Sequence, residues 1–156
     1  MTLLIAGTIP DKTIPLTVGI VDTDGDYLTV EGRRFPCMQG TGAMISAALA
    51  ATRYLKLDAP RVVIAGDTGD GAGSRAIYDF LIHSIAKLSP TVLALHYWLP
   101  DMAQTKRLCE AIEKCEKRPI MIADAASMYS AKASGMAPKF DIFTPDATEM
   151  AFLADP

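Results

Sequence analysis

Continuously apolar stretches alternate with helical patterns over most of the chain. Apolar residues three and four positions apart predict helices over residues 72–88 and 101–117. The apolar stretches lack the alternation of a strand with one wet face, and this is typical of strands covered on both faces. We therefore predict a three-layer α/β fold with a mostly parallel, Rossmann-like sheet and helices on both faces, whose strands include residues 62–66, 91–95, 120–124 and 140–144.

The first part of the chain has a different pattern. "LTVGIV" and "YLTVEGRRF" are rich in β-formers and flank "DTDGD", in which Gly25 is free to take a positive φ, so residues 16–35 read as a hairpin. We place this hairpin region, residues 1–36, at one edge of a single domain that spans residues 1–156. The next stretch, "MQGTGAMISAALAATRYLKL", predicts a helix that is apolar all round and hence buried.

Composition excludes several classes of protein. The chain has 156 residues, half of them apolar, and a net charge of −3, so it offers no basic patch for nucleic acid or for an anionic membrane. No apolar run is long enough for a membrane span, and the N-terminus lacks the features of a signal peptide. An odd number of cysteines without a CxxC pair favours reduced thiols in the cytoplasm and argues against zinc; they are Cys37, Cys109 and Cys115.

In parallel sheets, ligands bind beyond the carboxyl ends of the strands. The loop "GDTGDGAGS" lies there and is flexible enough to wrap a ligand, although no Lys-Ser/Thr follows it as in a phosphate-binding loop. Acidic residues in this loop, and His96 where a ribose-binding acid would be needed, also argue against a nicotinamide dinucleotide. His96 itself is a poor catalytic-triad candidate, because no serine or cysteine nucleophile lies near it in the sequence.

Acidic residues lie at or just beyond the ends of two predicted strands. Asp124 either caps the turn that follows its strand or faces a ligand. Asp146 and Glu149 share a face in the first turn of the terminal helix, where acids stabilise a helix N-terminus. Helix capping is enough to explain Asp146 and Glu149, and a ligand-binding role for these two residues stays open.

The order of three segments resembles the first part of a ribokinase-like domain, the superfamily of sugar and vitamin kinases. "GTGAMISAALAATRYL" resembles the family's glycine-rich entry to its first long helix. "VVIAGDTGDGAGSRAIYDFL" resembles its next strand and G-x-x-G-D-x-x-G loop, and "DIFTPDATEMAFL" resembles its PNxxE segment. The resemblance covers about residues 36–156. The tail and "IADAASMYSA" are also similar to the ADP- or ATP-dependent NAD(P)H-hydrate dehydratases, which share the fold.

This resemblance implies an ATP-dependent kinase for a small, carbohydrate-like molecule, or an N-terminal fragment of one. A hydrate dehydratase that uses ADP or ATP is the alternative enzyme, and a non-catalytic nucleotide- or metabolite-binding half-domain is the alternative of another class. The implied metal is Mg²⁺ at Asp146 and Glu149, with Thr144 beside them at the phosphate edge. The implied substrate-binding residues are Gly40, Thr41, Gly42, Gly69, Asp70, Gly71, Gly73 and Asp124.

The chain departs from the family pattern at two points. Asp146 stands where the kinases have Asn and the dehydratases have His. The family's glycine-rich anion hole, with its catalytic Asp, lies beyond Pro156, so no catalytic base can be named. We therefore expect either a homo-oligomer or a chain whose C-terminal segment is missing, with an uncovered sheet edge or apolar face.

Overall fold

The computed structural model describes residues 2–155 and is built around a six-stranded sheet. The order across this sheet is β2-β6-β1-β7-β8-β9, and all neighbouring strands are parallel except β2, which is antiparallel to β6. The strands are β1 (Leu3–Ile9), β2 (Thr17–Ile20), β6 (Arg61–Gly66), β7 (Val92–Leu95), β8 (Ile120–Ala123) and β9 (Ile142–Phe143).

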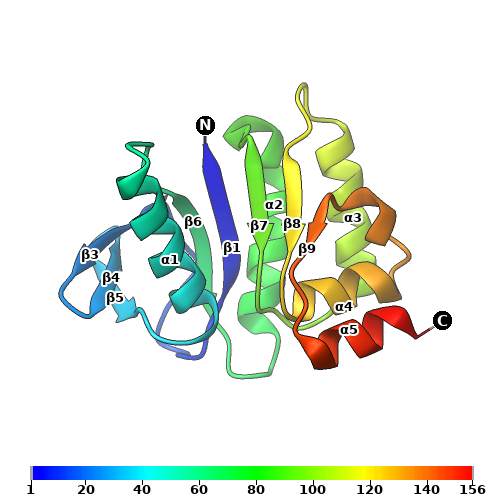
Figure 1. Ribbon diagram of the computed structural model, residues 1–156, viewed down its shortest axis with the longest axis horizontal. Coiled ribbons are helices and arrows are strands. Elements are labelled where there is room, and N and C mark those ends of the chain that lie inside the picture. Colours follow the sequence, from blue (N-terminus) through cyan, green and yellow to red (C-terminus); the bar gives the residue numbers. More distant parts are fainter. Residues whose placement is uncertain (1, 156) are drawn as a thin grey trace.

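Helices lie on both faces of this sheet, which confirms the α/β class and the mostly parallel sheet. Figure 1 shows α1 in front of the sheet, with α2 and α3 behind it. The helices are α1 (Gly40–Tyr54), α2 (Ala72–Leu88), α3 (Met102–Glu113), α4 (Ala126–Ala133) and α5 (Ala147–Ala154), with a short 3₁₀ helix, η1 (Ala137–Lys139).

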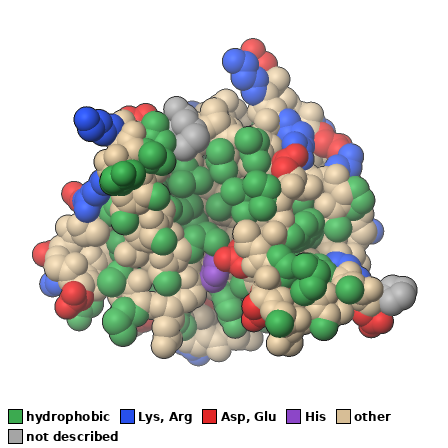
Figure 2. Space-filling view, in the orientation of Figure 1, with side chains coloured by type: hydrophobic (Ala, Val, Ile, Leu, Met, Phe, Trp, Pro, Cys, Tyr) green, Lys and Arg blue, Asp and Glu red, His purple; other side chains and the backbone are tan. Residues whose placement is uncertain are grey.

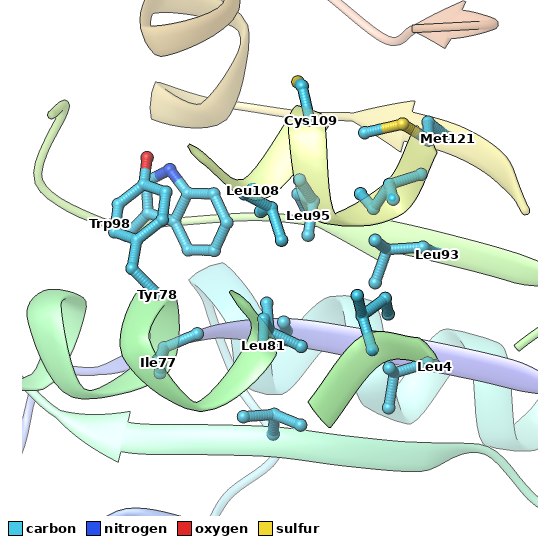
Figure 3. Close-up of a cluster of buried hydrophobic side chains, with 14 of the residues drawn as sticks. Leu4, Ile77, Tyr78, Leu81, Leu93, Leu95, Trp98, Leu108, Cys109 and Met121 are labelled. Atoms are coloured by element: carbon cyan, nitrogen blue, oxygen red, sulfur yellow. The ribbon is translucent and has the colours of Figure 1, made fainter. Parts of the chain in front are cut away.

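Two buried clusters form the core, one on each face of the sheet, because successive strand residues point to opposite sides. Leu4 of β1 belongs to the cluster under α2 and α3, and Ile5 belongs to the cluster under α1. Figure 3 shows the first cluster, where Tyr78 lies against Trp98 with ring centroids 4.3 Å apart. Leu95 of β7 also belongs to this first cluster. His96 follows Leu95 and faces the other way, towards Thr41 of α1.

The four predicted strands are confirmed as parallel members of the sheet, but the prediction missed its central strand. β1 lies between β6 and β7 and pairs with both. Its sequence, "LLIAGTI", lies next to the N-terminus with no helical pattern directly before or after it, so the alternation of elements that identifies the later strands was absent there. The helix predicted over residues 101–117 ends at Glu113, before the charged residues that follow it.

The predicted hairpin over residues 16–35 is wrong in its first strand. β2 pairs with β6 of the large sheet, with Val18 opposite Val63. A separate three-stranded antiparallel sheet follows, made of β3 (Asp22–Asp24), β4 (Tyr27–Val30) and β5 (Arg33–Pro36). The turn between β3 and β4 is where it was predicted, with Gly25 at φ 58°. β6 has an edge that is not paired with β1, and its N–H and C=O groups hydrogen-bond to β2. This pairing joins segments distant in the sequence, so the local pattern did not predict it.

Helix α1 was predicted to be buried all round, and this is also wrong. Ile45 and Leu49 are buried against the sheet, whereas Ala43, Ala47 and Tyr54 on the opposite side are exposed, Tyr54 by 87%. The small apolar residues of this helix therefore do not all reach the core of the described chain.

The sheet face on the α1 side is incompletely covered. Ile122 packs at the margin of the cluster under α1, and Ile120 and Ile142 share its face of β8 and β9. Ile120 is 49% exposed and Ile142 is 45% exposed, although parallel strands are normally buried on both faces. The uncovered apolar face expected from the sequence is therefore present over β8 and β9.

Candidate functional site at the carboxyl edge of the sheet

The strand order identifies one position where a ligand site is expected. Counted along the chain, the five parallel strands lie across the sheet in the order second, first, third, fourth, fifth. The chain turns in opposite directions from β1 and from β7, so their carboxyl ends flank a topological switch point, where open α/β sheets bind ligands. His96 directly follows β7 at this point, and its backbone N–H donates to the carbonyl of Ala6 in β1.

Three polar side chains from distant parts of the chain meet at the switch point. Nδ1 of His96 lies 3.0 Å from Oγ1 of Thr41, at the N-terminus of α1. Nε2 of the same ring lies 3.7 Å from Oδ2 of Asp124, which follows β8. Thr41 is 2% exposed and His96 is 7% exposed, whereas the Asp124 side chain is 28% exposed. Figure 2 shows a histidine beside an acidic side chain near the middle of one face of the molecule.

The surroundings of the His96 ring favour its neutral form. Burial lowers its pKa below the ordinary value of 6.5, and the nearby charge of Asp124 opposes this shift without cancelling it. A neutral imidazole has one N–H donor and one acceptor nitrogen, so the site presents a defined donor–acceptor pattern. We call the set of Thr41, His96 and Asp124 the switch-point cluster.

The backbone around the switch-point cluster is shaped to bring its members together. Gly7 of β1 is required there, because a Cβ atom at this position would lie 2.7 Å from Oγ1 of Thr41. Two non-glycine residues next to the cluster have positive φ, namely Gln39 at 68° and Ala125 at 50°. Such conformations cost on the order of 1–3 kcal/mol each and gather at functional sites.

Asp124 has the capping role that the sequence left open, and its role towards a ligand stays a prediction. Its Oδ1 accepts a hydrogen bond of 2.9 Å from the N–H of Ala125 and so caps the turn into α4. Its Oδ2 faces His96. Each carboxylate oxygen therefore has a different neighbour, and only one of the two is committed to the local turn.

The glycine-rich loop between β6 and α2 is organised by Asp67, which the sequence did not single out for this role. Its two carboxylate oxygens accept hydrogen bonds from the N–H groups of Gly69, Gly71 and Ser74 and from the Ser74 hydroxyl, at distances of 2.6–3.1 Å. Desolvation would raise the pKa of Asp67, but these hydrogen bonds outweigh it and lower the pKa to about 2. Because these N–H groups already have a carboxylate partner, they are not free to bind an anionic ligand.

The other predicted residues of this loop have structural roles in the described chain. Gly73 lies against the backbone of Gly66, where an added Cβ would lie 2.3 Å from the Gly66 carbonyl oxygen. Asp70 is exposed, accepts a hydrogen bond from the N–H of Ala72 and lies 3.8 Å from Nζ of Lys12. The loop contacts the segment after β7 through a 2.8 Å hydrogen bond from Leu99 N–H to the Ser74 hydroxyl.

The predicted residues of α1 divide between the site and the core. Thr41 belongs to the switch-point cluster, and Gly40, with φ 50°, lies beside the His96 ring. Gly42 is explained by packing, since a Cβ there would lie 2.4 Å from the carbonyl oxygen of Pro36. A ligand could therefore reach the backbone at Gly40, whereas the backbone at Gly42 is covered by Pro36.

The acidic corner after β9 forms a capping box. The Glu149 N–H donates to Oδ1 of Asp146 at 2.8 Å, and the Asp146 N–H donates to Oε2 of Glu149 at 2.9 Å. Thr144 hydrogen-bonds through its N–H to the carbonyl of Ala123, which ties the corner to β8. The capping interpretation of these acids is therefore confirmed, and each keeps one carboxylate oxygen outside the box.

The acidic corner and α4 approach each other at this edge of the sheet. Desolvation raises the pKa of Tyr129 in α4, and the negative charges of Glu149 and Asp146 add to the shift. Phe152 of α5 also packs on Tyr129, with ring centroids 4.6 Å apart. Side chains after β7, β8 and β9 thus share the carboxyl edge, as the parallel strands require.

The catalytic Asp that the resemblance implies was placed beyond Pro156. Pro156 itself lies outside the described residues, which end at Asp155. The position of this catalytic group therefore stays a prediction, and the site is built from the side chains of residues 2–155 alone.

Residues 2–155 contain no group of three His, Cys, Asp or Glu side chains that could hold a metal ion. The free oxygens of Asp146 and Glu149 fit a weaker mode of Mg²⁺ binding, in which one or two carboxylates act together with water and substrate phosphates. In that mode the metal would neutralise charge on the phosphates of a nucleotide.

A comparison with known proteins finds a relative in Methanocaldococcus jannaschii. This protein, described as "Uncharacterized protein MJ1337", is 36% identical to the chain over 112 residues. The match covers 72% of this chain but 44% of the relative, so the chain spans less than half of the relative's length. No family model matches the chain, and no solved structure matches it. Every helix within residues 2–155 is too short or too polar to cross a membrane.

Proposed function

We propose that the chain is the substrate-binding part of a ribokinase-like, ATP-dependent kinase that acts on a small hydroxylated molecule. The observation that carries this proposal is the switch-point cluster, because it places a neutral imidazole and a half-buried carboxylate where α/β sheets bind ligands. Both groups suit a neutral, hydroxyl-rich ligand, and the carboxylate disfavours an anionic one.

Two groups of residues at the carboxyl edge of the sheet would have different roles in phosphoryl transfer. The switch-point cluster would bind and orient the acceptor molecule, and orientation alone accounts for a large part of the rate enhancement in such reactions. Asp146 and Glu149 would hold Mg²⁺ near the nucleotide phosphates, directly or through water. The glycine loop would form part of the wall of the site and would not bind an anion, because its N–H groups donate to Asp67.

The test uses the protein produced from its full open reading frame. The protein is incubated with Mg²⁺ and ATP or ADP and with a panel of pentoses, hexoses and linear polyols, and phosphorylated product is detected by phosphorus NMR. We expect transfer from ATP to one class of sugar-like molecule, lost in His96→Ala and Asp124→Asn. His83→Ala is the matched control, because His83 is exposed on α2 and bonds only to its own helix.

The same assay separates the alternatives. Hydrated NADH is added as a second substrate, and recovery of NADH absorbance without sugar phosphorylation would identify the dehydratase instead. Binding of Mg-ATP in calorimetry without turnover of either substrate would leave the non-catalytic binding module. The absence of both turnover and Mg-ATP binding would refute the kinase proposal.

A further inference from the structure

Nε2 of His96 and Oδ2 of Asp124 face each other across a short gap. Nε2 and Oδ2 are 3.7 Å apart, which is too far for a direct hydrogen bond. Among the described residues Nε2 has no hydrogen-bond partner, and it is not one of the fully buried unpaired atoms, so a ligand or water can reach it. A ligand oxygen placed to one side of this gap could lie within hydrogen-bond distance of both atoms.

The surroundings of the His96 ring select one tautomer. If the proton were on Nδ1, the lone pair of Nε2 would face the negative Oδ2 of Asp124 and be repelled by it. With the proton on Nε2, that repulsion disappears, and Nδ1 accepts a hydrogen bond from the Thr41 hydroxyl at 3.0 Å. The gap is therefore bounded by an N–H donor on one side and a carboxylate acceptor on the other.

We propose that His96 and Asp124 form a clamp for one hydroxyl group of the ligand, which accepts from Nε2–H and donates to Oδ2. Thr41 acts as a positioning residue, because its hydroxyl bonds to Nδ1 and fixes the orientation of the ring. The proposal rests on the proposed function in that it names the group of the substrate bound at the same site. It assigns His96 and Asp124 as specificity-determining residues.

The clamp discriminates by hydrogen-bond direction. A hydroxyl group both accepts and donates, whereas a carbonyl or an ether oxygen cannot donate to Asp124, and a deoxy position leaves both partners unpaired. Loss of a hydrogen bond to a charged group costs about 1.5–3 kcal/mol, so a deoxy analogue should bind about 10- to 100-fold more weakly. A carboxylate or phosphate at this position would be repelled by Asp124.

Protonation of His96 should close the clamp. A charged imidazolium would attract Asp124 and shorten the 3.7 Å gap to a direct ion pair, which excludes the ligand hydroxyl. Asp124 is the charged group that faces the ring from the turn after β8, Thr41 faces it from α1, and the centroid of the Tyr97 ring lies 5.7 Å from that of His96. Ligand binding should therefore weaken as the pH falls below the ordinary histidine range.

The experiment follows the His96 ring directly, by proton–nitrogen NMR of the chain labelled with ¹⁵N-histidine. In the free protein at neutral pH we expect His96 to be the Nε2–H tautomer, identified by its two nitrogen shifts, with His83 as the internal reference. Thr41→Ser should keep this tautomer, and Asp124→Ala should weaken the preference for it, because the charge that disfavours a lone pair on Nε2 is removed. A tautomer unchanged in Asp124→Ala would mean that the carboxylate does not select it.

Titration with the sugars and polyols of the panel, and with their deoxy analogues, then tests the clamp. We expect one probe to shift the His96 signals but not those of His83, with an affinity that falls in its deoxy analogue, in Asp124→Asn and at acidic pH. The Nδ1–H tautomer in the free protein, or a bound probe that leaves His96 unmoved, would overturn the inference. Probe binding at His96 without any phosphoryl transfer would overturn the kinase proposal and leave the clamp standing.

Discussion

Replacing Asp67 by Asn should destabilise the protein, because Asp67 alone accepts four hydrogen bonds that order the loop between β6 and α2. An amide has one acceptor oxygen, so at least one pair of these donors would lose its acceptor and face an N–H₂ group. Asp67 is only 9% exposed, and water cannot readily replace the lost partner.

The magnitude follows from the pKa of this carboxyl. Folding lowers it from 3.8 to about 2, and each unit corresponds to about 1.4 kcal/mol, so the charged form contributes about 2 kcal/mol to the free energy of unfolding. Because the folded pKa is lowered, this contribution is fully present above 3.8 and is lost as the pH falls through about 2. In a chain of this size it corresponds to a melting temperature lower by about 4–8 °C.

Urea denaturation of the wild type and of Asp67→Asn measures this difference. At neutral pH we expect a lower midpoint with an unchanged slope, and the difference between the two proteins should shrink as the pH is lowered from about 4 towards about 2. Asp70→Asn is the matched control, since Asp70 lies in the same loop but is exposed, and its carboxylate accepts one hydrogen bond, from Ala72. We expect its cost to be less than about 1 kcal/mol.

Two results would refute this reasoning. One is an Asp67→Asn protein as stable as Asp70→Asn at neutral pH, which would mean that the loop is ordered without the carboxylate. The other is a destabilisation that persists unchanged into acid, because a neutral Asp67 and an Asn should then be nearly equivalent.

Three further predictions concern the site and the sheet. Gly7→Ala should cost about 1–3 kcal/mol in urea denaturation, because the new methyl group would crowd Thr41; an unchanged midpoint would contradict the close packing. The lowered pKa of His96 means that the unfolded state binds a proton at a higher pH than the folded state, so the free energy of unfolding should fall as the pH drops below 6.5. In His96→Gln this free energy should fall less steeply with pH, and equal slopes in the two proteins would contradict the lowered pKa. The uncovered sheet face should make the 156-residue chain self-associate in sedimentation equilibrium, less so in Ile120→Lys, and a compact monomer at all concentrations would contradict this.

The candidate site was only partly predictable from the sequence. Asp124 stood out as a carboxylate at the end of a buried strand, and Thr41 lay in a glycine-flanked helix entry, but His96 was isolated because its partners are 55 and 28 residues away in the chain. Gly7 gave no signal, since a glycine in an apolar stretch does not reveal what packs against it. A carboxylate followed by a serine seven residues later is the only sequence trace of the Asp67 network.

The sequence by itself determined the local elements of this protein. The period of apolar residues specified α2, the runs of apolar residues specified four parallel strands, and the acid pair specified the capped start of α5, because each depends on neighbours a few residues apart. Only the tertiary structure decided the central place of β1, the pairing of β2 with β6 and the meeting of Thr41, His96 and Asp124. These depend on which strands lie side by side, and the hydrogen-bonding edge of a strand is the same for every partner, so local pattern cannot choose between them.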